Sequence, residues 1–220
     1  MLKYPCLVLD HDDTVVQSEL SVNYPCFLLA LEKFRPGQTM SLEDFTQWCF
    51  YQGFAELLRE EYSFTDAEMV EEFQMWVEYA KTHIPPAYPG MREIILEQKR
   101  RGGLVCVVSH SSRETILRDY RLHFGEEPDA IYAWELPPAQ RKPSPYPLRD
   151  IMERYSLAPQ QLLVVDDLKA GFEMASGAGV KCAFAAWSKL EVPAIRDYMN
   201  RLCSFSFDST QALKSFLFGE

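Results

Sequence analysis

The feature that most constrains the fold is a short apolar run, Cys6–Leu9, followed directly by Asp10, His11, Asp12 and Asp13. An apolar run of this length that ends in a polar turn is typical of a buried strand in a parallel sheet. Open α/β sheets bind their ligands at the carboxyl ends of such strands. The sequence therefore predicts an α/β protein with a ligand site at the end of its first strand.

Asp10 and Asp12 are two residues apart, so in an extended chain their side chains lie on the same face. Two carboxylates that close repel each other unless they share a proton or a cation. A divalent metal with hard oxygen ligands would relieve this repulsion. The alternative is that one acid only caps the next helix, but a cap needs one Asp rather than three. The pattern favours a metal-binding or catalytic site.

Composition excludes several classes of protein. The 220 residues carry a formal charge of −10, which argues against nucleic acid or an anionic membrane surface as a partner. No apolar run approaches the roughly 18–20 residues that cross a bilayer, and residues 1–5 lack a signal-peptide core. The six cysteines form no CxxC pair. We therefore expect reduced thiols and a cytoplasmic location.

Outside residues 18–83 the pattern alternates between strand and helix, which predicts a parallel sheet with helices on both faces. The expected strands are Cys6–Leu9, Leu104–Ser109, Ala130–Trp134, Gln161–Asp167, Val180–Ala186 and Cys203–Phe207.

Residues 18–83 have a helical pattern throughout. One helix is expected over Glu19–Phe34, and capping signals at Ser41 and Thr65 predict two more, running to about Glu60 and Thr82. The aromatic residues here recur at helical spacing, which indicates core packing. Twelve acids against four bases place −8 of the total charge in this segment, and its simplest interpretation is a solvated helix face.

Three expected strands end in polar side chains: Asp10 and Asp12 after the first, Ser109 after the second, and Asp166 and Asp167 after the fourth. Lys142 lies in a Pro-rich loop between the third and fourth strands. Each feature alone is weak, because Ser and Asp often cap helices. Their order and their common position at strand ends make a much stronger signal.

This set resembles the motifs of the haloacid dehalogenase superfamily, in particular its helical-cap (C1) branch with β-phosphoglucomutase-like and phosphoglycolate phosphatase-like members. Asp10-His-Asp-Asp-Thr14 resembles motif one, Ser109 motif two, Lys142-Pro143 motif three, and Val165–Gly171 motif four. The resemblance implies a doubly wound, Rossmann-like parallel sheet, formed by residues 1–14 and 88–220. An all-helical cap domain, residues 15–87, would be inserted after the first strand.

The resemblance also implies a chemistry. Asp10 would attack phosphorus and form an aspartyl phosphate, and Asp12 would act as general acid and then as general base. Ser109 and Lys142 would bind the phosphoryl oxygens and stabilise their charge. Mg²⁺ would be held by Asp10, the backbone carbonyl of Asp12, Asp166 and Asp167.

Three further residues lie within these motifs: His110, His11 and Asp13. His110 follows Ser109 and is a candidate for contact with the substrate. His11 alternates with the two acids, so we expect it to be packed or hydrogen-bonded rather than catalytic. Asp13 is expected to be a turn residue, since the family accepts Gly at that position.

The predicted function is hydrolysis of a small phosphorylated metabolite by a Mg²⁺-dependent phosphatase, acting as a monomer or homodimer. A sugar phosphomutase shares the same core residues and is the first alternative. It ranks second because Phe54, not a basic residue, follows Gly53 in the expected specificity loop. A non-enzymatic phospho-acceptor module is the third possibility, but the third strand ends in Glu135 without a suitable Asp.

Overall fold

The computed structural model describes residues 2–219. The chain divides into two compact units: one comprises the chain up to Val16 and from Pro86 onward, and the other is Gln17–Pro85. Each unit is described by itself below.

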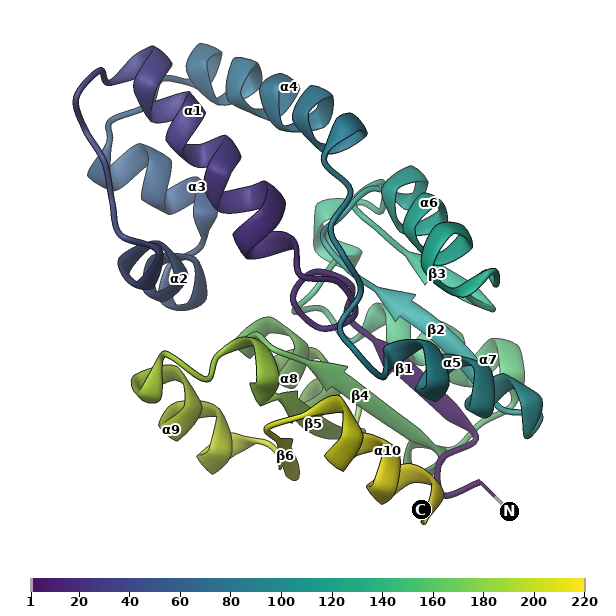
Figure 1. Cartoon of the computed structure of the whole chain (residues 1–220). Coiled ribbons are helices and arrows are strands. Elements are labelled where there is room, and N and C mark those ends of the chain that lie inside the picture. Colours follow the sequence, from purple (N-terminus) through teal and green to yellow (C-terminus); the bar gives the residue numbers. More distant parts are fainter. Residues whose placement is uncertain (1, 220) are drawn as a thin grey trace. The chain divides into compact units, whose positions relative to one another are not determined.

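The first unit is built on a six-stranded sheet in which every pairing is parallel (Figure 1). Its strand order is β3-β2-β1-β4-β5-β6, the doubly wound order in which the chain reverses direction next to β1. This confirms the predicted fold class. The strands are β1 (Cys6–Leu9), β2 (Leu104–Val108), β3 (Ala130–Tyr132), β4 (Leu162–Asp166), β5 (Lys181–Ala185) and β6 (Phe205–Phe207).

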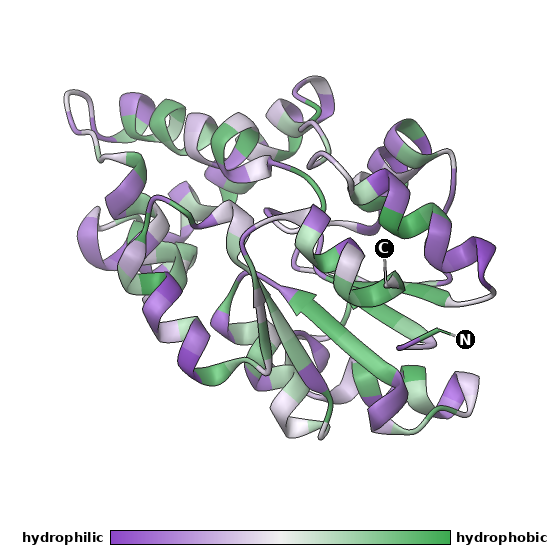
Figure 2. Cartoon of the chain, turned by 60° about the horizontal axis from the view of Figure 1, so that its bottom comes forward, coloured by the Kyte–Doolittle hydropathy of each residue, from purple (hydrophilic) through white to green (hydrophobic). Residues whose placement is uncertain are grey.

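Helices cover both faces of this sheet because successive strand residues point to opposite sides. Leu7 and Leu9 belong to a core shared with α5, α6 and α10, whereas Cys6 and Val8 belong to a second core shared with α7 and α8. Figure 2 shows the strands in the hydrophobic colours that burial on both faces requires. The helices of this unit are α5 (Met91–Arg100), α6 (Arg113–Phe124), α7 (Tyr146–Tyr155), α8 (Lys169–Gly177), α9 (Pro193–Leu202) and α10 (Thr210–Phe218).

The third strand is shorter than predicted. It was expected to reach Trp134 but ends at Tyr132. The Trp134 amide instead donates to the Ser111 carbonyl, and Leu136 closes a turn onto Ala133. The strand therefore ends at Tyr132, because the backbone after it forms hydrogen bonds with the loop that follows β2 and not with a neighbouring strand.

The second unit is helical, as predicted, and packs around a core of aromatic and Leu side chains. The expected caps are present: Ser41 accepts from the Asp44 amide, and Thr65 forms a full capping box with Glu68. The helices are α1 (Tyr24–Phe34), α2 (Leu42–Tyr51), α3 (Phe54–Glu56) and α4 (Asp66–Thr82), with π-helical turns at Glu19–Asn23 and Leu57–Glu61.

One helix prediction for this unit was wrong. A single helix was expected from Ser41 to about Glu60, but α2 ends at Tyr51 and a new helix starts at Phe54. Gly53 between them has a φ of 108°, a left-handed conformation that interrupts a right-handed helix and that Gly adopts readily.

Candidate functional site

The loop after β1 is a tight turn that projects its acids from the carboxyl edge of the sheet. The Asp10 amide still donates to the Val165 carbonyl of β4 at 2.9 Å, so Asp10 is fixed by the sheet itself. Val15 then donates to the His11 carbonyl, and Asp13 lies at a φ of 54°. The prediction that Asp13 is a turn residue is confirmed, because this conformation favours Gly, Asn and Asp.

Three carboxylates meet at this edge. Asp10, Asp166 and Asp167 are buried, and each offers one oxygen atom such that all three oxygens lie within 4.8 Å of one another. β1 and β4 are neighbours in the sheet, which brings together acids that are more than 150 positions apart in the sequence. Hard oxygen donors in a group this tight fit a divalent cation such as Mg²⁺.

Lys142 lies among these acids. Its Nζ donates to Asp10 Oδ1 at 2.7 Å and to Asp166 Oδ2 at 2.9 Å, and its side chain is almost fully buried. Burial alone would lower the pKa of Lys142, but the carboxylates of Asp10 and Asp166 outweigh it and raise the pKa. Lys142 is therefore a permanent cation in the site.

Burial shifts the pKa of the acids in the opposite direction to its effect on Lys142. Burial raises the pKa of Asp10 and of Asp166, because a charged carboxylate loses its hydration there. The Lys142 ammonium opposes that shift in both, and the neighbouring carboxylates add to it. A bound cation would stabilise the charged forms in the same manner as Lys142 does.

The backbone around motif four holds the Asp166 side chain tightly. The Leu168 amide donates to Asp166 Oδ1 at 2.9 Å. Gly171, in the first turn of α8, lies so close that an added Cβ would come within 2.1 Å of the Asp166 carboxyl carbon. A side chain at position 171 would therefore displace Asp166, which explains the need for Gly there.

Asp12 has a different environment from the other acids. Its Oδ2 accepts hydrogen bonds from Ser109 Oγ at 3.3 Å and from Ser111 Oγ at 2.5 Å. The Ser109 hydroxyl in turn accepts from the Ser111 amide. The structure thus brings Asp12 and Ser109 together, and it adds Ser111, which the sequence analysis did not identify. A second hydroxyl two residues after Ser109 was the available signal.

Asp167 also has partners that sequence reasoning missed. Its Oδ2 lies 3.0 Å from Lys189 Nζ, and its Oδ1 accepts from Thr14 Oγ1 at 3.4 Å. Lys189 follows the 3-10 turn Ala186–Ser188 at the end of β5. A lysine after the fifth strand was a weak signal, because most such lysines are solvated.

The two histidines of the motifs differ in position. His110 is exposed, and its Nε2 lies 3.1 Å from the Lys142 carbonyl. Partial desolvation of the ring and the nearby Lys142 charge both lower the pKa of His110, although the residue as a whole is exposed.

His11 is fully buried and turns away from the acids toward α6, where its Nε2 lies 3.1 Å from Asp119 Oδ2. This confirms the prediction that His11 is hydrogen-bonded. Burial would raise the pKa of Asp119, but hydrogen bonds with His11 and Arg118 outweigh it and lower the pKa.

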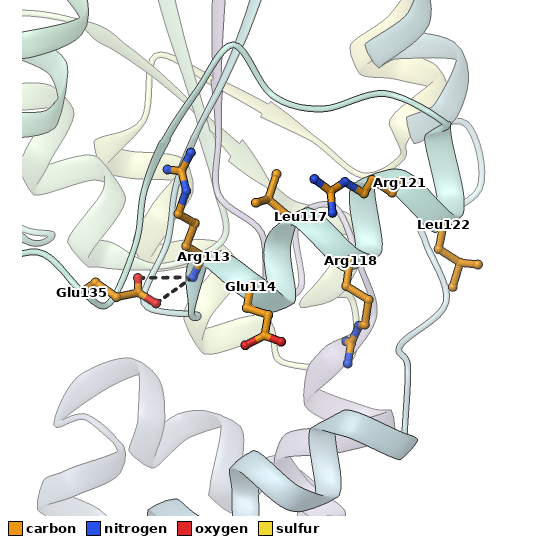
Figure 3. A pocket seen from close by; sticks show the side chains of 7 residues that line it. All are labelled: Arg113, Glu114, Leu117, Arg118, Arg121, Leu122 and Glu135. Carbon is orange, nitrogen blue, oxygen red and sulfur yellow. Dashed lines mark hydrogen bonds between the residues drawn. The ribbon is translucent and has the colours of Figure 1, made fainter.

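A surface groove runs along α6 and is separate from this site. Figure 3 shows its lining, which includes none of the motif acids: Arg113, Glu114, Leu117, Arg118, Arg121, Leu122 and Glu135. Its basic side chains are engaged, since Arg118 donates to Asp119 and Arg121 to Glu127.

A doubly wound sheet with clustered acids, a buried lysine and serine hydroxyls at its carboxyl edge defines an α/β enzyme rather than a binding module. The family can be stated directly. The chain belongs to the haloacid dehalogenase-like hydrolases, whose family model matches residues 7–185. This confirms the resemblance seen in the motifs and the prediction that the chain is a hydrolase.

One curated protein is similar to this chain in sequence. A 98-residue stretch is 30% identical to protein CbbY of Cereibacter sphaeroides, covering 43% of this chain and 42% of that protein. The aligned part thus spans less than half the length of this curated relative.

Solved structures share the fold over nearly the whole chain. A predicted phosphoglycolate phosphatase from Haemophilus somnus has a TM-score of 0.76 at 17% identity, covering 98% of this chain and 99% of the other. CbbY from Rhodobacter sphaeroides, solved with xylulose-(1,5)bisphosphate, has a TM-score of 0.69 at 19% identity, covering 96% and 95%.

Proposed function

We propose that this protein is a Mg²⁺-dependent phosphatase that hydrolyses a small organic phosphomonoester through an aspartyl phosphate on Asp10. The observation that carries the proposal is the position of Lys142, which contacts both Asp10 and Asp166. It links the candidate nucleophile to the candidate metal ligands in one buried cluster. Membership of a hydrolase family favours this enzymatic function over a phospho-acceptor module.

In the first step, a carboxylate oxygen of Asp10 attacks phosphorus and the bond to the ester oxygen breaks. Asp12 gives its proton to that leaving oxygen, so that the product is a neutral alcohol. The hydrogen bond from Ser111 to Oδ2 fixes the Asp12 carboxyl, which leaves Oδ1 as the oxygen that exchanges the proton. The longer contact from Ser109 to Oδ2 is given up when the Ser109 hydroxyl donates to a phosphoryl oxygen. Lys142 offsets the repulsion between Asp10 and the incoming phosphate.

In the second step, Asp12 takes a proton from water, and the water oxygen attacks phosphorus. The bond between phosphorus and Asp10 breaks, which releases phosphate and restores the carboxylate. Lys142 and Ser109 bind the phosphoryl oxygens in both steps. Mg²⁺, held by Asp10, Asp166, Asp167 and the Asp12 carbonyl, would neutralise charge on the transferring group.

The helical unit, residues 17–85 in the structure, is proposed to be the cap domain that selects the substrate. The expected boundaries at residues 15 and 87 stay a prediction. A cytoplasmic location is also proposed. Its support is that all six cysteines are free thiols. Within residues 2–219, no helix has the length and apolar character to cross a bilayer.

A sugar phosphomutase is the second candidate. One observation favours keeping it: a structural neighbour, CbbY, was solved with a sugar bisphosphate. Incubation with a sugar monophosphate and the matching bisphosphate, followed by ³¹P NMR, separates the two functions. A mutase interconverts the monophosphate isomers, whereas a phosphatase releases inorganic phosphate.

The central test is turnover of an aryl phosphate by the wild-type protein and by Asp10→Asn. Release of phosphate should require Mg²⁺, stop on chelation and fall below detection in Asp10→Asn. Asp197→Asn, which makes the same change at an exposed position on α9, should retain wild-type activity. Undiminished turnover by Asp10→Asn would exclude the mechanism.

A further inference from the structure

Lys189 is a second buried cation in the acid cluster, and the proposed mechanism does not use it. Its side chain is 1% exposed and its Nζ lies 3.0 Å from Asp167 Oδ2, while Asp167 itself is 2% exposed. Lysine almost never occurs fully buried unless its charge is paired. The ion pair with Asp167 therefore accounts for its position.

The backbone conformation around Lys189 positions its side chain next to Asp167. The chain makes a 3-10 turn, Ala186–Ser188, where β5 ends, and the Lys189 amide closes it by donating to the Ala186 carbonyl at 3.0 Å. The Lys189 carbonyl then accepts from Val192, just before α9. Hydrogen bonds on both sides hold the residue beside β4, the neighbour of β5 in the sheet.

Each of the three acids forms an ion pair with one of two buried lysines. Lys142 contacts Asp10 and Asp166, and Lys189 contacts Asp167. Three carboxylates and two ammonium groups give the cluster a net charge of −1 instead of −3. Because all five groups are buried, their interactions are only weakly screened by water and salt. A divalent cation thus meets a cluster that is already mostly neutralised.

We infer that Lys189 is a positioning residue that serves as a resident counter-ion of Asp167 and weakens cation binding at the acid cluster. It holds Asp167 in place before a cation arrives, and its charge then opposes the cation. This inference rests on the proposed function, in which Asp167 is a metal ligand. It assigns a role to a residue outside the four motifs.

A purely structural role for Lys189 makes a different prediction. If Lys189 only orders Asp167, its loss should weaken cation binding, because the ligand becomes mobile. If its charge is what matters, removing the charge while keeping a hydrogen-bond donor should strengthen binding. Lys189→Gln makes that change, and Lys189→Arg keeps the charge.

The experiment is calorimetric titration of the metal-free full-length chain with MgCl₂. Lys189→Gln should bind Mg²⁺ about fivefold or more tightly than the wild-type protein, and Lys189→Arg should show no gain. Lys181→Gln is the matched control, because Lys181 is an exposed lysine at the start of β5, the strand that precedes Lys189. The Mg²⁺-dependent rise in melting temperature gives a second measurement, and Lys189→Met replaces the Gln variant if that variant does not fold.

Each outcome is decisive. Equal or weaker binding by Lys189→Gln overturns the inference, and leaves the proposed function intact if the wild-type protein binds Mg²⁺. If only the variant binds Mg²⁺, the role of Lys189 is supported and the proposed Mg²⁺ dependence is contradicted. If neither protein binds the ion, both are overturned.

Discussion

The Lys142 ammonium lies 2.7 Å from the carboxylate of Asp10, although the two residues are 132 positions apart in the chain. Both groups are buried, so each depends on the other to remain charged. A nucleophilic carboxylate must be ionised to attack phosphorus, and burial by itself raises the pKa of Asp10. The contact with Lys142 opposes that rise and favours the ionised form of Asp10.

Replacing Lys142 with Met should reduce both activity and stability. The change leaves Asp10 and Asp166 buried without their shared cation, and breaking a buried ion pair in this way costs about 3–5 kcal/mol. Loss of the phosphate-binding charge should lower kcat by roughly 10²–10³-fold. Urea denaturation and steady-state kinetics measure the two effects. Lys181→Met, at an exposed lysine on β5, should change neither by much.

Replacing Asp12 with Asn should remove proton transfer while preserving the fold. The Asn side-chain oxygen can still accept the hydrogen bonds from Ser109 and Ser111, so the melting temperature should change little. The rate should fall by roughly 10²–10⁴-fold for an alkyl phosphate, whose leaving oxygen needs a proton. The loss in the first step should be smaller for an aryl phosphate with an acidic leaving group. An equal loss for both substrates would contradict the role of Asp12 as general acid.

Replacing His11 with Leu should destabilise the core unit without direct loss of a catalytic group. Asp119 is fully buried and would lose the hydrogen-bond partner that lies 3.1 Å away while keeping its ion pair with Arg118, at a cost of about 1–3 kcal/mol. The double variant His11→Leu/Asp119→Leu should lose less than the sum of the two single changes, because both single changes remove the same hydrogen bond. Urea denaturation of the four proteins gives the coupling energy. His83→Leu, at an exposed histidine, is the control.

Glu72 should make the stability of the helical unit depend on pH. Burial raises the pKa of Glu72 to about 7 from 4.5, so between these values the folded chain binds a proton that the unfolded chain does not. Its stabilising contribution is present below about pH 4.5 and is lost as pH rises through 7. Glu72→Gln lacks this dependence and should be more stable than the wild-type protein at pH 8 by roughly 3 kcal/mol.

The measurement for Glu72 is urea denaturation of both proteins between pH 5 and pH 8. The difference in free energy of unfolding should grow with pH. Glu71→Gln, its exposed neighbour paired with Lys33, should show a small and nearly constant difference. A pH-independent difference for Glu72→Gln would mean that the carboxyl is already ionised at pH 5.

The sequence by itself determined the sheet and its edge. Apolar runs ending in Asp10, Ser109 and Asp166 specify buried parallel strands, because a strand covered on both faces has no polar positions until it ends. The capping residues Ser41 and Thr65 likewise specified where two helices begin, since caps act through bonds to the next turn. These signals are local and can be read without knowing the rest of the fold.

Only the tertiary structure decided which polar groups meet. Ser111 reaches Asp12 across 99 positions, Asp119 reaches His11 across 108, and Lys189 reaches Asp167 from the end of a neighbouring strand. Each residue lies in a turn or on a helix face where its type is common without a function. Burial removes water as a competing partner, so these pairs form because of where the sheet places them, and no local pattern in the sequence records that placement.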